Sequence, residues 1–355
     1  MKAVVVEKHG GPEVNQLKEI PDPTPGPTDV VIDVKASGVN PNEYWAREGK
    51  VRGFDLPLIL GSDAAGVVSQ VGSAVTHIQE GDEVAVYCGV GCRHCFRCIN
   101  GEEHLCENTF RIWGFDAGPM WGAHAEKVCM PAYNAVPKPT NTSFEEAASM
   151  PLTLVTAWHM LVANARVQPN DTVLIRGSSG GVGFFATQIA KMRGAKVIGV
   201  VSSEEKAKLS EKFGADETII RPHTTPETHK QVTKDFLADM KDRTRGRGVD
   251  VVFDSIGGET LMESIKLMRA GGKLVTCGAT AGYKTDLELA YIFIQNKTIM
   301  GSTLGTKAEL IQALRAVEAG HIKSLVTETL PLEKAGEAQQ LLQERKATGK
   351  VVLTR

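Results

Sequence analysis

The segment TVLIRGSSGGVG, residues 172–183, decides the fold of this chain. Residues 172–176 form an apolar, β-branched run with the length and composition of a buried strand. The run leads into a G-x-x-G-x-x-G loop, and a helix is expected from residue 181 to about 193. A strand, a glycine-rich loop and a helix in this order predict a nucleotide-binding unit, although glycines alone would also fit a plain tight turn. The loop residues are Gly177, Ser178, Ser179, Gly180, Gly181, Val182 and Gly183.

Strands and amphipathic helices keep alternating after this loop. Such alternation predicts a parallel, doubly wound sheet, an α/β fold of the Rossmann type, over residues 153–289. Glycines in the loop would let backbone N–H groups approach a pyrophosphate at the start of the helix. Further strands are expected at 196–201, 249–253 and 273–277, and helices near 204–213 and 261–268.

The flanking parts of the chain have a different pattern. Residues 1–152 contain short β-branched runs separated by Gly and Pro, which predicts a β-rich domain. The tail ends in a strand-like run at 350–354, and a lone terminal strand needs a sheet to pair with. We therefore expect two domains, one made of residues 1–152 and 290–355, the other of residues 153–289.

Four cysteines lie close together in the β-rich part, within a lobe of about residues 88–110. Cys92, Cys95, Cys98 and Cys106 have the spacing C-x2-C-x2-C-x7-C, which suits one tetrahedral zinc ion with no open position. Such a zinc would be structural. A disulfide pair is the alternative, but the opening MKAVVVEKHGG lacks the pattern of a signal peptide. We therefore expect a cytoplasmic protein with reduced thiols.

The composition limits the classes of partner. The chain has 355 residues, 42% hydrophobic and 23% charged, with a net charge of -2. These values are typical of a soluble globular protein, and the charge argues against a nucleic-acid or anionic-membrane partner. No apolar run approaches the roughly 20 residues that cross a bilayer.

The end of the second strand bears on the choice of cofactor. Dinucleotide folds that bind NAD place an acidic residue there to hold the ribose hydroxyls, whereas this chain has Val201. Ser202, Ser203 and Lys206 would suit a 2′-phosphate, and Arg221 is a further candidate. These residues favour NADPH over NADH, unless Lys206 simply belongs to a solvated helix face.

Four motifs carry a family resemblance that covers essentially the whole chain. They are GVNP at 38–41, LGSDAAGVV at 60–68, LVTAW at 154–158 and IMGST at 299–303. Together with the cysteine lobe they resemble the medium-chain dehydrogenase/reductase superfamily, and most closely its quinone-oxidoreductase-like branch. The resemblance implies a GroES-like catalytic domain, a small-molecule substrate and a homodimer or homotetramer. The strand-like run Tyr291 to Ile294 is a candidate edge for pairing between subunits.

The resemblance also indicates a missing metal site. Zinc alcohol dehydrogenases of this superfamily hold a catalytic zinc through a Cys, a His–Glu pair and a later ligand. Here Asn40, Ser62-Asp63 and Leu152 stand at those positions, so one structural zinc and no catalytic metal are expected. Without a Lewis acid the acceptor must be conjugated, such as a quinone, an enone, a 2-alkenal or a 2-enoyl-CoA.

The same loop supplies the candidate catalytic residues. Asn40 and Asn42 would donate hydrogen bonds to the acceptor carbonyl, although Asn40 before a proline also fits a turn. Tyr44 is a candidate proton donor, with core packing as the alternative. Thr156 and Ser302 match family positions near the nicotinamide, and Gly278 is a further candidate for binding the cofactor.

Residues 111–116 and 40–45 are similar to the crotonyl-CoA carboxylase/reductases. This likeness implies that Trp45, Phe115, Asp116 and Gln295 line the substrate pocket, unless the loop around Trp113 merely packs under the zinc lobe. Gln295 would stand in place of the family histidine, which favours a plain enoyl-CoA reductase. The leading hypothesis is an NADPH-dependent reductase of conjugated acceptors. A zinc alcohol dehydrogenase with unusual ligands and a non-catalytic NADPH-binding protein are the alternatives.

Overall fold

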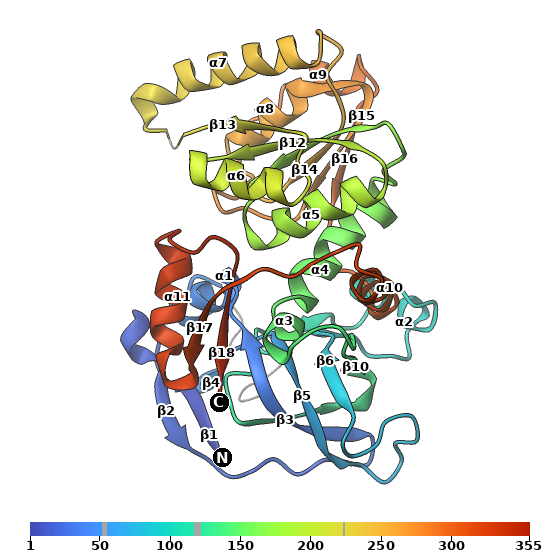
Figure 1. The fold of residues 1–355 in the computed structure, drawn as a ribbon, viewed down its shortest axis with the longest axis vertical. Helices are drawn as coiled ribbons and strands as arrows, with labels where there is room; N and C mark the ends of the chain where they lie inside the picture. Colours follow the sequence, from blue (N-terminus) through green and yellow to red (C-terminus); the bar gives the residue numbers. More distant parts are fainter. Residues whose placement is uncertain (52–54, 117–121, 223) are drawn as a thin grey trace. The chain divides into compact units, whose positions relative to one another are not determined.

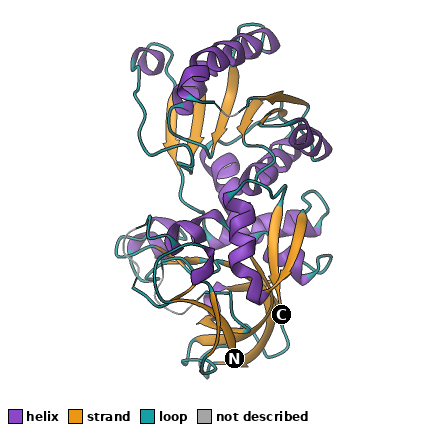
Figure 2. Ribbon diagram, turned by 90° about the vertical axis from the view of Figure 1, so that its left-hand side faces the viewer, coloured by secondary structure: helices purple, strands orange, loops and turns teal. Residues whose placement is uncertain are grey.

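The computed structural model describes residues 1–355 apart from 52–54, 117–121 and 223. The chain divides into two compact units, Met1–Val155 with Gly305–Arg355, and Thr156–Leu304. Both chain ends belong to the first unit (Figures 1 and 2). The second boundary corrects the prediction, because residues 290–304 join the nucleotide-binding unit rather than the β-rich one. They contain the last strand of its sheet, which is hydrogen-bonded to the preceding strand.

The nucleotide-binding unit contains a six-stranded parallel sheet in the order β13-β12-β11-β14-β15-β16. Helices α5 and α6 cover one face, and α7 and α8 cover the other, as the two views show (Figures 1 and 2). Apolar residues of the strands pack with Phe236 of α7 and Ile265 of α8 in one buried core. The strands are β11 (Thr172–Arg176), β12 (Lys196–Val201), β13 (Glu217–Ile220), β14 (Val249–Asp254), β15 (Met268–Thr276) and β16 (Thr298–Gly301); the helices are α5 (Gly181–Met192), α6 (Glu204–Lys212), α7 (Pro226–Arg243), α8 (Thr260–Leu267) and α9 (Ala290–Phe293).

One element of this unit differs in kind from its prediction. The run from Tyr291 to Ile294 is helical, because α9 covers most of it and Phe293 N donates to Leu289 O at 3.1 Å. A short apolar run does not by itself distinguish a helix from a strand. The strand at this edge of the sheet is β16.

The β-rich unit is built on a sheet in the order β10-β6-β5-β3-β18-β17, with β9 also paired to β3. The terminal strand β18 is antiparallel to β3 and parallel to β17, so it joins this unit as expected. A smaller sheet has the order β2-β1-β4. The strands are β1 (Lys2–Val6), β2 (Gln16–Glu19), β3 (Asp29–Gly38), β4 (Leu58–Ile59), β5 (Asp63–Val71), β6 (Glu83–Val86), β7 (Gly89–Val90), β8 (Arg111–Ile112), β9 (Lys127–Pro131), β10 (Ala135–Pro137), β17 (Val326–Pro331) and β18 (Lys350–Thr354).

The helices of the β-rich part are short. Within the described part of the chain, no helix combines the length and apolar character that a membrane crossing requires. The helices are α1 (Pro41–Arg47), α2 (Phe96–Ile99), α3 (Phe144–Ala148), α4 (Pro151–Trp158, which contains the unit boundary), α10 (Lys307–Glu318) and α11 (Ala335–Gln343). Single 3₁₀ turns cover Pro12–Val14, Glu103–Leu105, Ala132–Asn134 and Leu332–Lys334, and a π-helical turn, His159–Asn164, follows α4.

Candidate functional site

The register of three neighbouring strands brings together residues that are far apart in the sequence. Gly38, the last residue of β3, pairs with Asp63 of β5 on one side and Val352 of β18 on the other. Because β18 is antiparallel to β3, continuing this register places Lys350 opposite Asn40. Asn40 itself immediately precedes α1, so its side chain stands where the strand ends and the helix begins.

Asn40, Asp63 and Lys350 form a buried, hydrogen-bonded cluster. The side chain of Asn40 donates from Nδ2 to Asp63 Oδ2 at 2.8 Å. Lys350 Nζ donates to Asn40 Oδ1 at 2.7 Å and lies 3.4 Å from Asp63 Oδ2. The other carboxylate oxygen of Asp63 accepts from the backbone N of Leu152 at 2.7 Å. The positions that the resemblance assigned to catalytic metal ligands therefore converge, and a lysine ammonium lies among them.

Sequence reasoning missed Lys350. A signal was present in the sequence, because the final strand reads Lys-Val-Val-Leu-Thr, an apolar run that opens with a lysine; in the structure its first four residues are buried. Lysine is rarely buried unless it is paired, so a lysine opening a buried strand indicates an acceptor at the same depth.

Three buried polar atoms on residues that adjoin this cluster in the chain or lie on the Trp113 loop have no hydrogen-bond partner among the described residues. They are Ser62 Oγ, Asn42 Oδ1 and Trp113 Nε1. The Trp113 loop lies against residues 61 and 62, because a Cβ on Gly114 would come within 1.9 Å of Gly61 O. A buried polar atom without a partner costs about 1–3 kcal/mol, so such atoms indicate room for water or a polar ligand.

Tyr44 lies one helical turn beyond Asn40. Its half-buried ring contacts Trp45 edge to face, with centroids 5.6 Å apart. Burial raises the pKa of Tyr44, so the phenol is protonated at neutral pH. The charged groups that also influence its pKa are Arg345, Glu48 and Lys50, which belong to the far end of α1 and the segment after α11. Tyr44 and Trp45 therefore face a different environment from Asn40.

Phe115 packs against a neighbouring apolar cluster, whereas Asp116 bonds within its own loop. The ring of Phe115 packs against a buried apolar cluster that includes Ala46 of α1. One carboxylate oxygen of Asp116 accepts a hydrogen bond from the backbone N of Ile112, and burial raises the pKa of Asp116. Fully buried Cys88 experiences the charges of Asp116, Asp63 and Lys350, so this loop and the Asn40 cluster are neighbours.

The glycine loop has the geometry that a pyrophosphate requires. Gly177 has φ +71°, and Gly180 N donates back to Gly177 O at 2.9 Å, which closes the turn. A Cβ on Gly183 would come within 2.1 Å of Gly177 O, so only glycine lets α5 approach the start of the loop this closely. The first N–H groups of a helix have no acceptor within the helix and favour an anion. Ser178 Oγ accepts from Ser210 Oγ at 2.7 Å, which ties the loop to α6.

Three of the four residues predicted to hold a 2′-phosphate lie together at the start of α6. Lys206 Nζ is 3.5 Å from Ser202 Oγ, and Ser203 Oγ accepts from the backbone N of Lys206 at 3.4 Å. Arg221 does not join them. Its guanidinium is 9% exposed and donates from Nη2 to Glu263 Oε1 at 2.6 Å, so it belongs to a buried ion pair.

The remaining predicted cofactor positions divide between the sheet and α4. Ser302 N donates to Thr276 O at 2.9 Å, which places Ser302 at the carboxyl end of the parallel strands, the end that carries the glycine loop. Gly278 follows β15 at the same end, where a Cβ would come within 2.3 Å of Ser255 O. Thr156 is buried in α4 and is the first residue of this unit.

The position of Gln295 does not support the pocket role expected for it. Gln295 precedes β16, and its backbone O accepts from Gly271 N at 2.8 Å. In the register of β15 and β16, Thr298 lies at the amino end and Gly301 at the carboxyl end. Gln295 therefore lies at the end of the sheet opposite the glycine loop.

The four cysteines of the lobe are arranged as zinc ligands. Their Sγ atoms all lie within 4.8 Å of one another, and the Cys92–Cys98 and Cys95–Cys106 Sγ pairs are 3.9 Å apart. Zn–S bonds of about 2.3 Å in a tetrahedron give sulfur separations of about 3.8 Å, so the four residues fit the ion. Burial alone would raise the pKa of Cys92, but backbone hydrogen bonds from His94 and Cys95 lower it to about 6.

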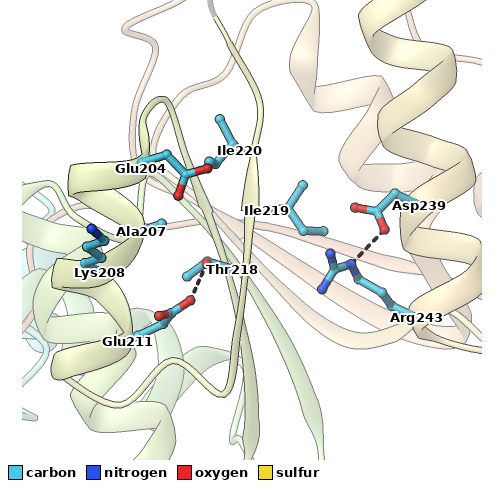
Figure 3. A pocket seen from close by; sticks show the side chains of 9 residues that line it. All are labelled: Glu204, Ala207, Lys208, Glu211, Thr218, Ile219, Ile220, Asp239 and Arg243. Atoms are coloured by element: carbon cyan, nitrogen blue, oxygen red, sulfur yellow. Dashed lines mark hydrogen bonds and ion pairs between the residues drawn. The ribbon is translucent and has the colours of Figure 1, made fainter.

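A hollow of about 420 Å³ lies beside edge strand β13, between α6 and α7 (Figure 3). Thr218 Oγ1 donates to Glu211 there at 2.6 Å, and Arg243 donates to Asp239 at 2.8 Å. These polar groups already have partners, and the hollow lies at the outer edge of the sheet rather than at the glycine loop. It carries no functional assignment.

Two family models match the chain. The alcohol dehydrogenase GroES-like domain matches residues 26–140, and the zinc-binding dehydrogenase domain matches residues 181–319. A crotonyl-CoA reductase of Streptomyces collinus is 34% identical over 363 residues, which cover 94% of this chain and 80% of that protein. The chain belongs to the medium-chain dehydrogenase/reductase superfamily.

Other members of the superfamily are also similar over all or nearly all of their length. An acryloyl-coenzyme A reductase of Metallosphaera sedula is 30% identical, with 100% of both chains covered. A solved NAD-dependent alcohol dehydrogenase is 40% identical, with a TM-score of 0.92 and 100% of both chains covered. The crotonyl-CoA carboxylase/reductase AntE in complex with NADP is 28% identical, with a TM-score of 0.88, covering 100% of this chain and 94% of that one. This superfamily member is therefore an oxidoreductase that uses a nicotinamide cofactor.

Proposed function

We propose that this protein is an NADPH-dependent reductase that transfers hydride to a conjugated acceptor without a catalytic metal. The acceptor class is a 2-enoyl-CoA, such as crotonyl- or acryloyl-CoA, an enone or 2-alkenal, or a quinone. The observation that carries the proposal is the buried cluster of Asn40, Asp63 and Lys350.

The contents of this cluster argue against a second zinc ion there. Lys350 already places a positive charge beside Asp63, and a divalent cation at the same place would be repelled by it. Asp63 accepts from Asn40, from Lys350 and from the backbone of Leu152, so its lone pairs are largely used. An amide and a single carboxylate are also poor substitutes for the three ligands that a catalytic zinc requires.

The chemistry that remains is hydride transfer to an acceptor that is already electron-poor. The reduced nicotinamide supplies the hydride when the cofactor is bound. Asn40 uses one Nδ2–H on Asp63 and keeps the second to donate to the oxygen that becomes negative in the acceptor. The unpaired polar atoms of Ser62 and Asn42 are further groups that can bind the acceptor or an ordered water.

NADPH is the cofactor that the start of α6 favours. A 2′-phosphate accepts strong hydrogen bonds from an ammonium and hydroxyls, and Lys206 and Ser202 provide both next to a helix N-terminus. The absence of an acidic residue at Val201 removes the usual partner of the NAD ribose. The NADP complex of the similar AntE structure agrees with this preference.

Metal analysis combined with steady-state kinetics tests the proposal. We expect one zinc per chain, NADPH oxidation with crotonyl-CoA, a 2-alkenal or a quinone, and no oxidation of saturated alcohols. A second zinc per chain, together with NAD-dependent oxidation of alcohols, would overturn it.

That outcome describes the second candidate function, a zinc-dependent alcohol dehydrogenase with unusual ligands. The 40% identity to an NAD-dependent alcohol dehydrogenase favours it. The two candidates differ in metal content, cofactor and substrate, so the same experiment separates them.

A further inference from the structure

We propose that Lys350 is a positioning residue for the reaction, acting through Asn40. Its ammonium places a fixed positive charge beside Asn40, and it orients and polarises the Asn40 amide. This inference rests on the proposed function and names the source of the electrostatic stabilisation of the oxygen that becomes negative in the acceptor.

The orientation of Asn40 follows from its two hydrogen bonds. An amide can be turned by half a revolution about its last bond, which exchanges its donor and acceptor ends. Lys350 can only donate and an ionised Asp63 can only accept, so Oδ1 must face Nζ and Nδ2 must face the carboxylate. The remaining Nδ2–H then points in one fixed direction, as an oxyanion donor requires.

The same contacts make that donor stronger. An ammonium 2.7 Å from Oδ1 withdraws electron density from the amide, and this interaction is little screened because Lys350 and Asn40 are 3% and 1% exposed. The ion pair with Asp63, at 3.4 Å, offsets part of the free-energy cost of burying the charge of Lys350. The cluster is also held by backbone bonds, since Lys350 N donates to Leu325 O and Val39 N to Val351 O, both at 2.9 Å.

Kinetics of Lys350→Met and Lys350→Arg with NADPH and crotonyl-CoA test this role, with crotonyl-CoA replaced by whichever conjugated acceptor the wild type reduces. We expect Lys350→Met to lower kcat by about 100-fold, the size of a lost oxyanion contact, with little change in KM or in NADPH affinity. Lys350→Arg should recover part of the rate because it keeps the charge. Lys297→Met is the matched control, since Lys297 is also buried and bonds a backbone carbonyl, Ile265 O, at 2.6 Å; it should keep the wild-type kcat.

A double-mutant cycle with Asn40→Ala separates this role from simple packing. If Lys350 acts through Asn40, adding Lys350→Met to Asn40→Ala should cost little more than Asn40→Ala alone. Fully additive losses, or a Lys350→Met enzyme with wild-type kcat, would overturn the proposal while leaving the reductase function intact. Should Lys350→Met fail to fold, the double variant Lys350→Met/Asp63→Asn, which removes both charges of the ion pair, takes its place in the cycle. Fully additive losses with Asn40→Ala, or a wild-type kcat, would again overturn the proposal. A wild-type protein inactive with every conjugated acceptor would instead refute the function itself.

Discussion

A single lysine is expected to set the cofactor preference. Lys206 lies 3.5 Å from Ser202 at the start of α6, where a 2′-phosphate would gain a charge-assisted hydrogen bond. Replacing Lys206 by Ala should weaken NADPH binding by about 10- to 100-fold, the worth of one hydrogen bond to a charged group, and leave NADH binding unchanged. Fluorescence titration of the reduced cofactors measures both affinities.

The control for this change is Lys208→Ala. Lys208 is exposed on the same helix, two residues further on, so its removal changes the net charge equally without touching the predicted phosphate site. Equal losses for NADPH and NADH in Lys206→Ala, or equal effects of the two substitutions, would contradict the assignment.

The sequence locates a residue along an element more reliably than it shows where its side chain points. Asn40 and Asp63 could be predicted as neighbours because family motifs contain both. Lys350 could not be predicted as a neighbour of these two residues. It is 310 residues from Asn40 and reaches it only through the register of β18 on β3. Arg221 follows a strand at the expected place, yet its guanidinium faces the helices rather than Ser202.

The ion pair of Arg221 joins several secondary-structure elements. Glu263 of α8 accepts from Arg221 at 2.6 Å, from Arg176 of β11 at 2.8 Å and from Thr233 of α7 at 2.6 Å. Burial would raise the pKa of Glu263, but the charges of Arg176 and Arg221 and the Thr233 hydrogen bond hold it below its ordinary value. These contacts connect β11 and the residue that follows β13 to the two helices that cover this face of the sheet.

Acid should therefore weaken the nucleotide-binding unit through Glu263. A carboxyl group whose pKa is lowered on folding contributes stability above its unfolded pKa, near 4.5, and loses it as the pH falls through the folded value. Glu263→Gln should lower the unfolding temperature at neutral pH, since breaking a buried pair costs about 3–5 kcal/mol. The difference from the wild type should shrink below about pH 4.5. Calorimetry across this range measures it.

Glu259→Gln is the comparison for that experiment. Glu259 immediately precedes α8, but its side chain is 80% exposed, so its loss should change the unfolding temperature little. A Glu263→Gln protein as stable as Glu259→Gln at neutral pH would show that the network contributes nothing.

Buried parallel strands were the elements easiest to predict. Strands β11 and β12 begin and end at the predicted residues, because a strand covered by helices on both faces reads as a continuous apolar run. The prediction of a strand-like run at residues 291–294, where the structure has helix α9, was wrong because this segment is not such a buried run. Its apolar residues are partly exposed and follow no period that would separate helix from strand.

The division of the whole chain into units depended on one strand. β16 belongs to the nucleotide-binding sheet only because it pairs with β15, and pairing is a long-range property that local composition does not encode. The boundary consequently falls at Leu304 and Gly305 instead of residues 289 and 290.

β16 is also the place where we propose that two copies of the chain associate. It is an edge strand of the six-stranded sheet within the described part of the chain, and edge strands invite pairing. Beside it in the sequence, Leu289, Phe293 and Ile294 are 63%, 69% and 66% exposed. Large apolar side chains gathered next to an open edge are typical of an isologous two-fold interface.

Phe293→Asp tests this interface against another exposed apolar surface, on the zinc lobe. Phe96, on the zinc lobe, is 67% exposed and provides a matched Phe96→Asp control. Light scattering should give at least twice the 38.2 kDa chain mass for the wild type and for Phe96→Asp, and a smaller assembly for Phe293→Asp, because a buried carboxylate opposes association. If Phe96→Asp alone reduced the mass, the contact would lie on the zinc lobe and the open edge of β16 would face solvent.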